Sequence, residues 1–171
     1  MTAPAGPRGG RPAEAAAYPP EDSVGHQVRW AHRALQREIE EALRPYGITT
    51  GMWYFLRALW EEDGLTQREL SERVGITEPT TVTALNALEK RALVVRVPNS
   101  TDRRKSNIHL TRPARELRDL LLPQARMVNA TATAGLAAAE IAALTATLAK
   151  IRANLAAAAE QRRALFRQLK G

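Results

Sequence analysis

The sequence of 171 residues contains no cysteine, which excludes disulfides, thiolate metal sites, cysteine nucleophiles and thiol-based redox sensing. Its apolar stretches are rich in alanine and are interrupted by Glu, Lys or Thr, so none approaches the roughly 20 apolar residues that a membrane-spanning helix needs. A basic start followed by an apolar run is also lacking, as is typical of proteins without a signal peptide. We therefore expect a cytoplasmic protein that has no membrane partner.

The motifs of common enzymes are lacking as well. His26 and His32 are six residues apart and would lie on different faces of a helix, unlike a zinc-binding histidine pair. The sequence contains no phosphate-binding loop, no glycine-rich dinucleotide-binding motif and no GxSxG motif of serine hydrolases. The acidic cluster at 61–63 could suggest a metal, but a solvated helix end before Gly64 is the simpler interpretation. We expect no catalytic residue, no metal site and no cofactor, although an enzyme remains the first alternative.

Positive charge is present in excess and is unevenly distributed. Lys and Arg number 25 against 18 Asp and Glu, a formal net charge of +7 that favours a polyanionic partner. Residues 94–118 hold seven of the basic residues and only two acidic ones, whereas residues 49–93 hold five basic and seven acidic ones. The excess therefore lies in a short segment in the middle of the chain, which is unusual for a generic solvated surface.

Prolines and glycines divide the chain. Five of the ten prolines lie in the first twenty residues, so residues 1–21 are predicted to be a disordered arm. Apolar residues then recur every three or four positions from Val24 to Leu43, which predicts a helix, and a second helix is expected from about Thr49 to Asp63. Later in the chain, Thr111 begins a further helix that Pro123 would kink or end. Fifteen of residues 130–159 are alanine, which predicts closely packed helices.

Residues 66–110 have the pattern of two short helices followed by a β-hairpin. Thr66 and Glu69 form a capping box, Gly75 permits a left-handed helix exit, and Thr77 can cap the next helix with Pro79 in its first turn. Two β-prone runs, 93–98 and 106–110, flank a polar, arginine-rich loop. This order indicates a helix-turn-helix with an adjoining hairpin.

The second helix of this pair is a candidate for the major groove of DNA. With Val82, Leu85 and Leu88 taken as its inner side, the outer side is small and hydroxylated and ends in cations, which suits base edges and phosphates. A merely solvated helix with scattered threonines is the alternative. In the hairpin loop, an Arg side chain can enter the narrow minor groove, and Asp102 can hold Arg104 extended or simply form the turn.

The run from Leu65 to Thr111 resembles the winged helix-turn-helix core of MarR-family transcriptional regulators. The most specific part is Asp102-Arg103-Arg104 followed by a strand that ends in Leu110-Thr111. The family often has Asp where this chain has Asn99, which we expect to weaken one turn contact. The resemblance extends loosely from Val24 to Leu155. It implies a mainly α fold with a small β-wing, in which residues 49–111 form the winged helix-turn-helix and residues 22–48 and 112–171 form a helical dimerisation region.

By this resemblance the protein is a homodimer that binds a pseudo-palindrome in double-stranded DNA, with dimer contacts through Val28, Leu35, Leu144, Leu148, Ile151 and Leu155. We assign Arg104 to the minor groove, with Asp102 supporting it. We assign Thr80, Thr83 and Ala84 to the major groove. The predicted phosphate contacts are Thr77, Thr81, Lys90, Arg103 and Lys105.

In this family, small effectors, often phenolic or carboxylated aromatics, bind between the dimerisation helices and the winged domain. Here that cleft would be lined by His26, Arg29, Trp30, Arg33, Trp53 and Tyr54, although the tryptophans could equally be core and the arginines a solvated face. Residues 51–56 and 77–81 are similar to a subgroup that represses aromatic-acid catabolism. We therefore expect a repressor released by an aromatic acid or its CoA thioester, and the alternative is an effector-independent architectural DNA-binding protein.

Overall fold

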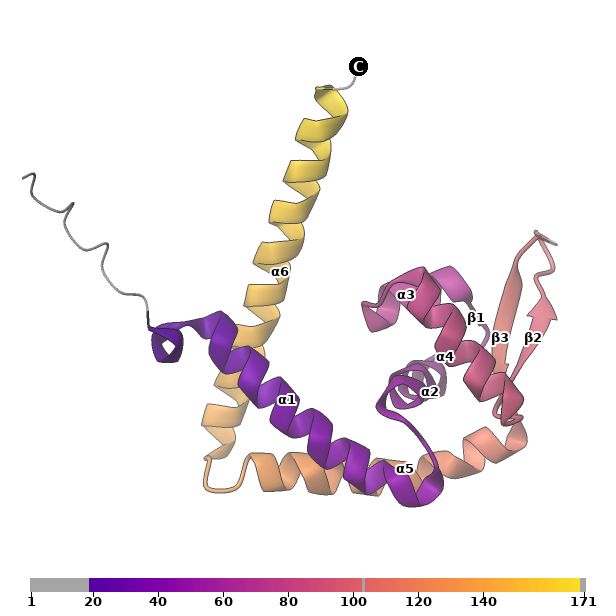
Figure 1. Ribbon diagram of the computed structural model, residues 1–171, viewed down its shortest axis with the longest axis horizontal. Helices are drawn as coiled ribbons and strands as arrows, with labels where there is room; N and C mark the ends of the chain where they lie inside the picture. Colours follow the sequence, from indigo (N-terminus) through magenta and orange to yellow (C-terminus); the bar gives the residue numbers. More distant parts are fainter. Residues whose placement is uncertain (1–18, 103, 170–171) are drawn as a thin grey trace, which may run out of the picture. The chain divides into compact units, whose positions relative to one another are not determined.

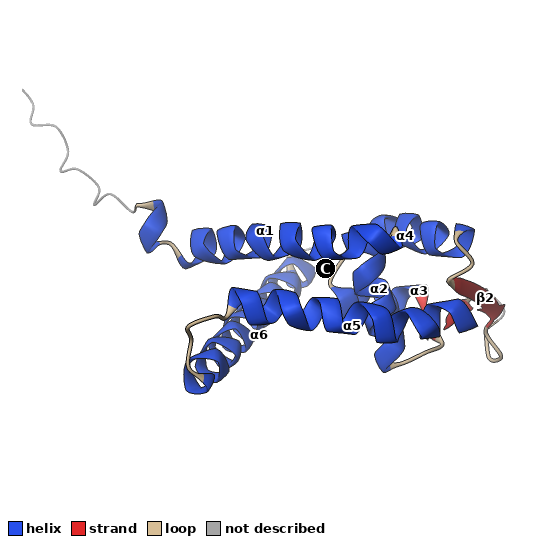
Figure 2. Ribbon diagram, turned by 90° about the horizontal axis from the view of Figure 1, so that it is seen from below, coloured by secondary structure: helices blue, strands red, loops and turns tan. Residues whose placement is uncertain are grey.

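The computed structural model describes residues 19–102 and 104–169 and is mostly helical, with one small sheet (Figures 1 and 2). Its helices are α1 (Val24–Leu43), α2 (Thr50–Glu61), α3 (Gln67–Val74), α4 (Glu78–Lys90), α5 (Arg112–Ala132) and α6 (Ala138–Gln168). Its strands are β1 (Leu65–Thr66), β2 (Val94–Pro98) and β3 (Ser106–Leu110), and short 3-10 turns span Pro20–Asp22 and Arg44–Tyr46. The mainly α fold with a β-wing is thus confirmed. The residues cluster into two units that divide within α5, after Leu120.

The core of the first unit lies around α2, which packs against α3, α4 and β3. Phe55 and Leu56 of α2 are fully buried, as are Leu70 of α3 and Leu85 of α4. Burial of each such side chain stabilises the fold by about 1.5–3 kcal/mol. This core holds the two short helices and the sheet in one compact unit, within which α3 and α4 lie beside the strands (Figure 1).

The sheet has the strand order β1-β3-β2 and is antiparallel throughout. The hairpin of β2 and β3 pairs Val94 with Leu110 at its base and Pro98 with Ser106 near its tip. β1 adds only two residues, with Leu65 opposite Ile108, and the sequence pattern gave no indication of it. The central strand β3 is therefore bonded on both sides, which fixes the wing to the helical body.

The predicted helix signals are mostly confirmed. Thr66 and Glu69 form the capping box, and Gly75 ends α3 with a φ of 73°. Thr111 accepts a hydrogen bond from the N–H of Ala114 at 3.4 Å, as a cap should. Thr77 occupies the cap position of α4, but its hydroxyl shares a 3.0 Å hydrogen bond with the hydroxyl of Thr80. The second position of α4 is Pro79, which has no N–H for the Thr77 hydroxyl to accept from.

The second unit contains the rest of α5 and all of α6. Pro123 lies inside α5, so of the two predicted effects, a kink or an end of the helix, the end is wrong, and the helix continues to Ala132. A turn follows in which Gly135 has a φ of 84° and Glu140 accepts a hydrogen bond from the N–H of Ala137 at 2.7 Å. No residue in the Ala138–Gln168 helix is buried. No helix in the described part of the chain is long and apolar enough to cross a membrane.

Candidate nucleic-acid interface

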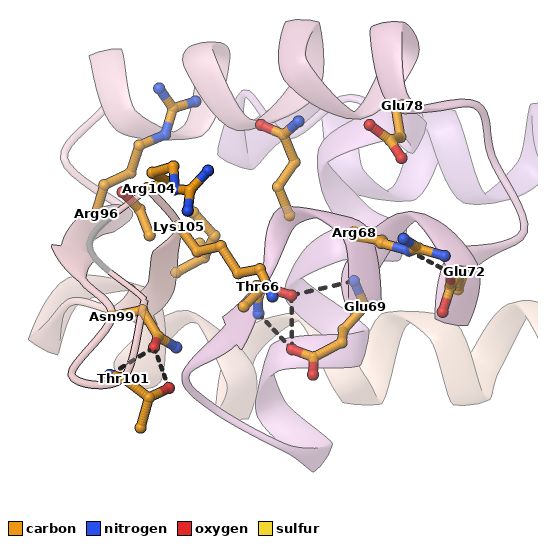
Figure 3. A pocket seen from close by; sticks show the side chains of 13 residues that line it. Thr66, Arg68, Glu69, Glu72, Glu78, Arg96, Asn99, Thr101, Arg104 and Lys105 are labelled. Carbon is orange, nitrogen blue, oxygen red and sulfur yellow. Dashed lines mark hydrogen bonds and ion pairs between the residues drawn. The ribbon is translucent and has the colours of Figure 1, made fainter.

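A groove of about 880 Å³ lies between the helix-turn-helix and the wing (Figure 3). Arg96, Arg104 and Lys105 come from the wing, whereas Glu69 and Glu72 come from α3. The groove is therefore cationic on the side of the wing and contains carboxylates on the side of α3. Its full lining is Thr66, Gln67, Arg68, Glu69, Glu72, Glu78, Arg96, Asn99, Thr101, Arg104, Lys105, Ser106 and Ile108.

The helix α4 is rotated relative to the sequence-based expectation. Its buried positions are Thr81, Leu85 and Leu88, whereas Val82, predicted to face inward, is 36 % exposed. On a helix of 3.6 residues per turn, the side opposite these buried positions carries Thr83, Asn86 and Lys90, all of which are exposed. Of the predicted DNA contacts on α4 and its cap, Thr77, Thr80, Thr83 and Lys90 are exposed and Ala84 is half-buried.

The assignment of Thr81 to a phosphate contact needs correction. Its side chain is 0 % exposed, and its hydroxyl donates to the carbonyl oxygen of Thr77 over 3.1 Å. A threonine whose hydroxyl bonds back to the preceding turn fills the same space as valine, so it can take an inner position that apolarity alone would assign to Val82. Thr81 is a core residue of α4 and is not available to DNA.

Asn86 is a residue of the exposed face that the sequence interpretation missed. Its Oδ1 accepts a hydrogen bond of 2.7 Å from Nη2 of Arg96 on β2. Nη1 of Arg96 also lies 3.6 Å from a carboxylate oxygen of Glu89. The signal that could have revealed Asn86 is the i, i+4, i+7 spacing of Thr81, Leu85 and Leu88, which places it outward.

The sequence pattern ends the outer side of this helix in two cations, Lys90 and Arg91, but Arg91 has a structural task instead. Its guanidinium donates to the carbonyl oxygen of Tyr46 at 3.1 Å and also to that of Gly47. Gly47 has a φ of 63°. The end of α4 is thereby fixed to the connection between α1 and α2.

The tip of the wing is organised by Asn99. Its Oδ1 accepts hydrogen bonds of 2.9 Å from the N–H groups of Thr101 and Asp102, and its Nδ2 donates to Oδ1 of Asn107 at 2.8 Å. The turn contacts at this position are thus made by a neutral amide, which accepts as an aspartate would and adds a donor. Asn107 in turn donates to the carbonyl oxygen of Gly64 at 2.7 Å, which ties the tip to the body.

Asp102 combines the two tasks considered for it. Its Oδ1 accepts from the N–H of Arg104 at 3.1 Å and so shapes the turn. Its carboxylate also lies 3.8 Å from Nε of Arg104 and 3.8 Å from Nζ of Lys105. The Arg104 side chain is 97 % exposed, so it projects freely from the wing. Arg103, the other predicted phosphate contact here, lies outside the described residues.

The acidic cluster at 61–63 is exposed at the end of α2, as the sequence predicted, but Asp63 also has a structural task. Its carboxylate accepts from the N–H of Leu110 at 2.8 Å, from Nη2 of Arg115 at 2.7 Å and from the N–H of Gly64 at 3.0 Å. Partial burial acts to raise the pKa of Asp63, but these hydrogen bonds and the charge of His109 outweigh burial and lower it. Among the described residues, no three acidic or histidine side chains are grouped to hold a metal ion.

Four of the six predicted effector residues line two separate depressions, and His26 and Arg29 line neither of them. Trp30 and Arg33 border one of about 590 Å³ on α1, and His26 packs edge-on against Trp30 at 5.7 Å. Trp53 and Tyr54 border another of about 360 Å³, together with residues of α2 and α3. Trp53 is only 4 % exposed and packs edge-on against Trp60, so it is largely a core residue. Arg29 is exposed on α1.

Comparison with known proteins identifies the fold and the family. A model of the MarR family matches residues 46–105, the segment from the 3-10 turn after α1 through the wing loop. The crystal structure of a MarR transcriptional regulator from Methanosarcina mazei Go1 is 27 % identical, with a TM-score of 0.72, over 77 % of this chain and 94 % of that one. Residues 46–105 therefore form a MarR-family domain. The family and the fold are those of transcriptional regulators and not of enzymes.

Two other proteins are also similar to this chain. It is 29 % identical over 91 residues to a "putative transcriptional regulatory protein for hcr operon" of Thauera aromatica. That match covers 53 % of this chain and spans about half, 55 %, of the relative. CouR of Rhodococcus jostii RHA1, solved bound to p-coumaroyl-CoA, is 23 % identical with a TM-score of 0.71, over 79 % of this chain and 95 % of that one. At 23 % identity, the similarity to CouR establishes the fold alone.

Proposed function

We propose that this protein is a homodimeric repressor that binds a pseudo-palindromic operator and is released by a small aromatic acid or its CoA thioester. The observation that carries the DNA-binding part is the groove between the helix-turn-helix and the wing, together with the exposed outer face of α4. Thr83 and Lys90 are exposed on the outer face of α4, and Arg104 and Lys105 are exposed on the wing. A helix with small hydroxylated residues suits the major groove, and an extended arginine suits the minor groove beside it.

The homodimer is supported by apolar side chains that a single chain leaves exposed. On α1, Val24, Val28 and Leu35 are 57 %, 42 % and 37 % exposed and lie on one helical face. On α6, Leu144, Leu148 and Leu155 are also exposed, while Ile151 is partly covered. Helices with apolar stripes are stable in water when a partner covers the stripes. A second copy of the chain supplies matching stripes, as in an isologous dimer.

The effector class is supported by the groups near the two depressions and by the ligand of CouR. Arg33 beside Trp30 on α1 combines a cation with an aromatic wall. Arg57 lies 5.6 Å over the ring of Trp53, beside the exposed Tyr54. Such pairs suit a flat ring that carries a carboxylate. We keep His26, Arg29, Trp30, Arg33, Trp53 and Tyr54 as the proposed effector residues.

The experiment that tests this function is footprinting of the purified protein on DNA that flanks its own gene. The footprint is repeated with a panel of aromatic acids and their CoA thioesters. We expect a protected pseudo-palindrome that one ligand class releases, and we expect Arg104→Ala to weaken protection at fixed salt. Diffuse protection that no ligand alters and that falls with salt on any DNA would instead establish the architectural alternative.

A further inference from the structure

Arg96 of β2 connects the wing to two side chains of α4. Its Nη2 donates to Oδ1 of Asn86 over 2.7 Å, and its Nη1 lies 3.6 Å from Oε2 of Glu89. Asn86 and Glu89 are three residues apart on α4, so they are neighbours on one side of that helix. A planar guanidinium that is engaged through two of its nitrogens is restrained in orientation as well as in position.

The strand β2 is otherwise held to the helical body only near its base. It is an edge strand, because the described sheet has the order β1-β3-β2 and β2 pairs there with β3. The structure describes all five residues of β2, and only Val94, opposite Leu110 at the base of the hairpin, is buried. Val95 and Val97, which flank Arg96, are both exposed. Arg96 therefore contacts α4 midway along a strand whose outer part has no side chain in the core.

A cation beside the groove could also bind a DNA phosphate directly, but two features favour the internal role. Both terminal nitrogens of Arg96 already face partners on α4, and one of these partners is a carboxylate that balances its charge. In addition, Glu89 lies on a helix that is proposed to approach a polyanion, and an unpaired carboxylate there would repel the phosphates. Pairing with Arg96 gives this acidic residue a role that is compatible with DNA binding.

We infer that Arg96 is a positioning residue that fixes the wing against α4, so that Arg104 and the outer face of α4 meet DNA in one fixed arrangement. The inference rests on the proposed function, because it requires α4 and the wing to contact DNA together. A wing that already has its bound orientation loses less conformational freedom on binding. It follows that Glu89, although acidic, supports DNA affinity.

The first test is the sign of the effect of Glu89→Ala on binding to the operator that footprinting defines. Removal of a negative charge near DNA strengthens binding if only electrostatics acts. If Glu89 helps to hold Arg96, the wing loosens, and we expect the affinity to fall by about threefold or more. Fluorescence anisotropy at fixed salt measures the change. An affinity that rises in Glu89→Ala overturns the inference.

Glu72→Ala is the matched control. Glu72 lines the groove and carries the same charge, but its partner Arg68, at 3.0 Å, is on the same helix α3, so this pair does not connect the helix to the wing. We expect the affinity of Glu72→Ala to rise. Thermal unfolding of each variant reports whether it folds. If Arg96→Ala does not fold, the sign of the Glu89→Ala effect decides alone.

The second test is a double-mutant cycle between Arg96 and Arg104. If Arg96 only binds a phosphate, the losses from Arg96→Ala and Arg104→Ala multiply. If Arg96 positions the wing, Arg104→Ala should weaken binding by about tenfold in the wild type and by about threefold or less in Arg96→Ala. Arg96→Lys keeps the charge, but a single ammonium cannot replace the two-sided contact, so it should resemble Arg96→Ala. A cycle of Arg68→Ala with Arg104→Ala should show no such coupling.

The third test needs no DNA. Hydrogen exchange of the backbone amides in free protein reports local opening. We expect amides in the outer part of the β2–β3 hairpin to exchange faster by about threefold or more in Arg96→Ala and in Glu89→Ala, with no change in α2. Unchanged exchange in the hairpin of both variants contradicts the inference.

The outcomes separate this inference from the proposed function. If the wild-type protein protects an operator but the losses in the cycle multiply, the positioning role is wrong and the regulator remains. The same holds if Arg96→Lys binds as the wild type does, because charge alone then suffices. If the wild-type protein protects no operator, the proposed function fails, and the positioning role fails with it whatever the exchange rates are.

Discussion

At the scale of single residues, Asn99 shows how a neutral side chain can organise a charged loop. Its amide oxygen satisfies backbone donors of the tip, and its amide nitrogen reaches Asn107 on the facing strand. Because Asn107 itself is bonded to the carbonyl oxygen of Gly64, the tip is connected to the end of α2 through two amides. The position of Arg104 therefore depends on a residue that carries no charge.

Replacing Asn99 by alanine should loosen the wing. We expect Asn99→Ala to lower the free energy of unfolding by about 1–2 kcal/mol, because it removes the acceptor for two N–H groups and the bond to Asn107. Urea denaturation measures the loss. Asn99→Asp keeps the acceptor and loses only the donor, so it should lie between the wild type and alanine. Equal stability of all three proteins would contradict this account of the tip.

The lowered pKa of Asp63 predicts how the free energy of unfolding depends on pH. Its pKa lies below the ordinary value in the folded chain, so its contribution is fully present above the unfolded pKa of about 4. That contribution is lost as the pH falls through the lower, folded pKa. We expect Asp63→Asn to be less stable than the wild type at pH 7 and to lose less stability between pH 7 and pH 3. Urea denaturation at both pH values measures the difference.

Glu69 provides the control for this pH dependence. The pKa of its carboxylate is also lowered, chiefly by the hydrogen bond from the N–H of Thr66, so its contribution to stability is also lost on acidification. A Glu69→Gln variant should therefore retain the part of the acid sensitivity that belongs to Asp63. If Asp63→Asn and the wild type lose stability in parallel on acidification, Asp63 does not have this structural task.

At the scale of elements, the sequence predicted the helices well because their ends carry local chemistry. The capping box at Thr66, the left-handed Gly75 and the cap at Thr111 act within a few residues of themselves. The rotation of α4 was not predictable in the same way, because Thr81 is buried only when its hydroxyl bonds to the turn before it. The two-residue strand β1 exists only through its pairing with β3, which no local pattern records.

The rotation of α4 can be tested with two matched substitutions. Thr81→Val preserves the shape of a buried side chain, and the carbonyl of Thr77 still accepts from the N–H of residue 81. We expect its DNA affinity to stay within about twofold of the wild type. Thr83→Val makes the same chemical change on the exposed face and should weaken operator binding by about fivefold or more. Fluorescence anisotropy at fixed salt measures both. A larger effect at Thr81 would restore the original assignment of the helix face.

At the scale of the whole molecule, the sequence predicted apolar stripes on the first and last helices but could not show whether another part of the chain covers them. In the structure, Val28, Leu35 and Leu148 are at least one third exposed. Periodicity reports that a face is apolar, whereas its covering depends on contacts distant in sequence or in a second chain. The sequence could not show that the predicted effector residues lie apart for a similar reason. Whether a tryptophan is covered depends on its packing, and Trp53 packs against Trp60 in the core.

The dimer is tested by placing a charge on the exposed stripe of α1. We expect Leu35→Asp to convert a dimer into a monomer at micromolar concentration, because an unpaired carboxylate would be buried at the interface. Light scattering measures the mass. Arg37→Asp is the control, since Arg37 is exposed two residues away on the opposite face of the helix and should leave the mass at two chains. A wild-type protein that is already monomeric would refute the dimer.

The use of an amide in place of an acid at Asn99 also affects how fast the protein can find DNA. The loop 99–105 contains three basic residues and one acidic residue, and an aspartate at 99 would add a second negative charge. Charges of one sign on a projecting loop raise the rate of encounter with a polyanion, most strongly at low ionic strength. Because the turn is built without that second negative charge, the wing keeps its full positive potential during the approach to DNA.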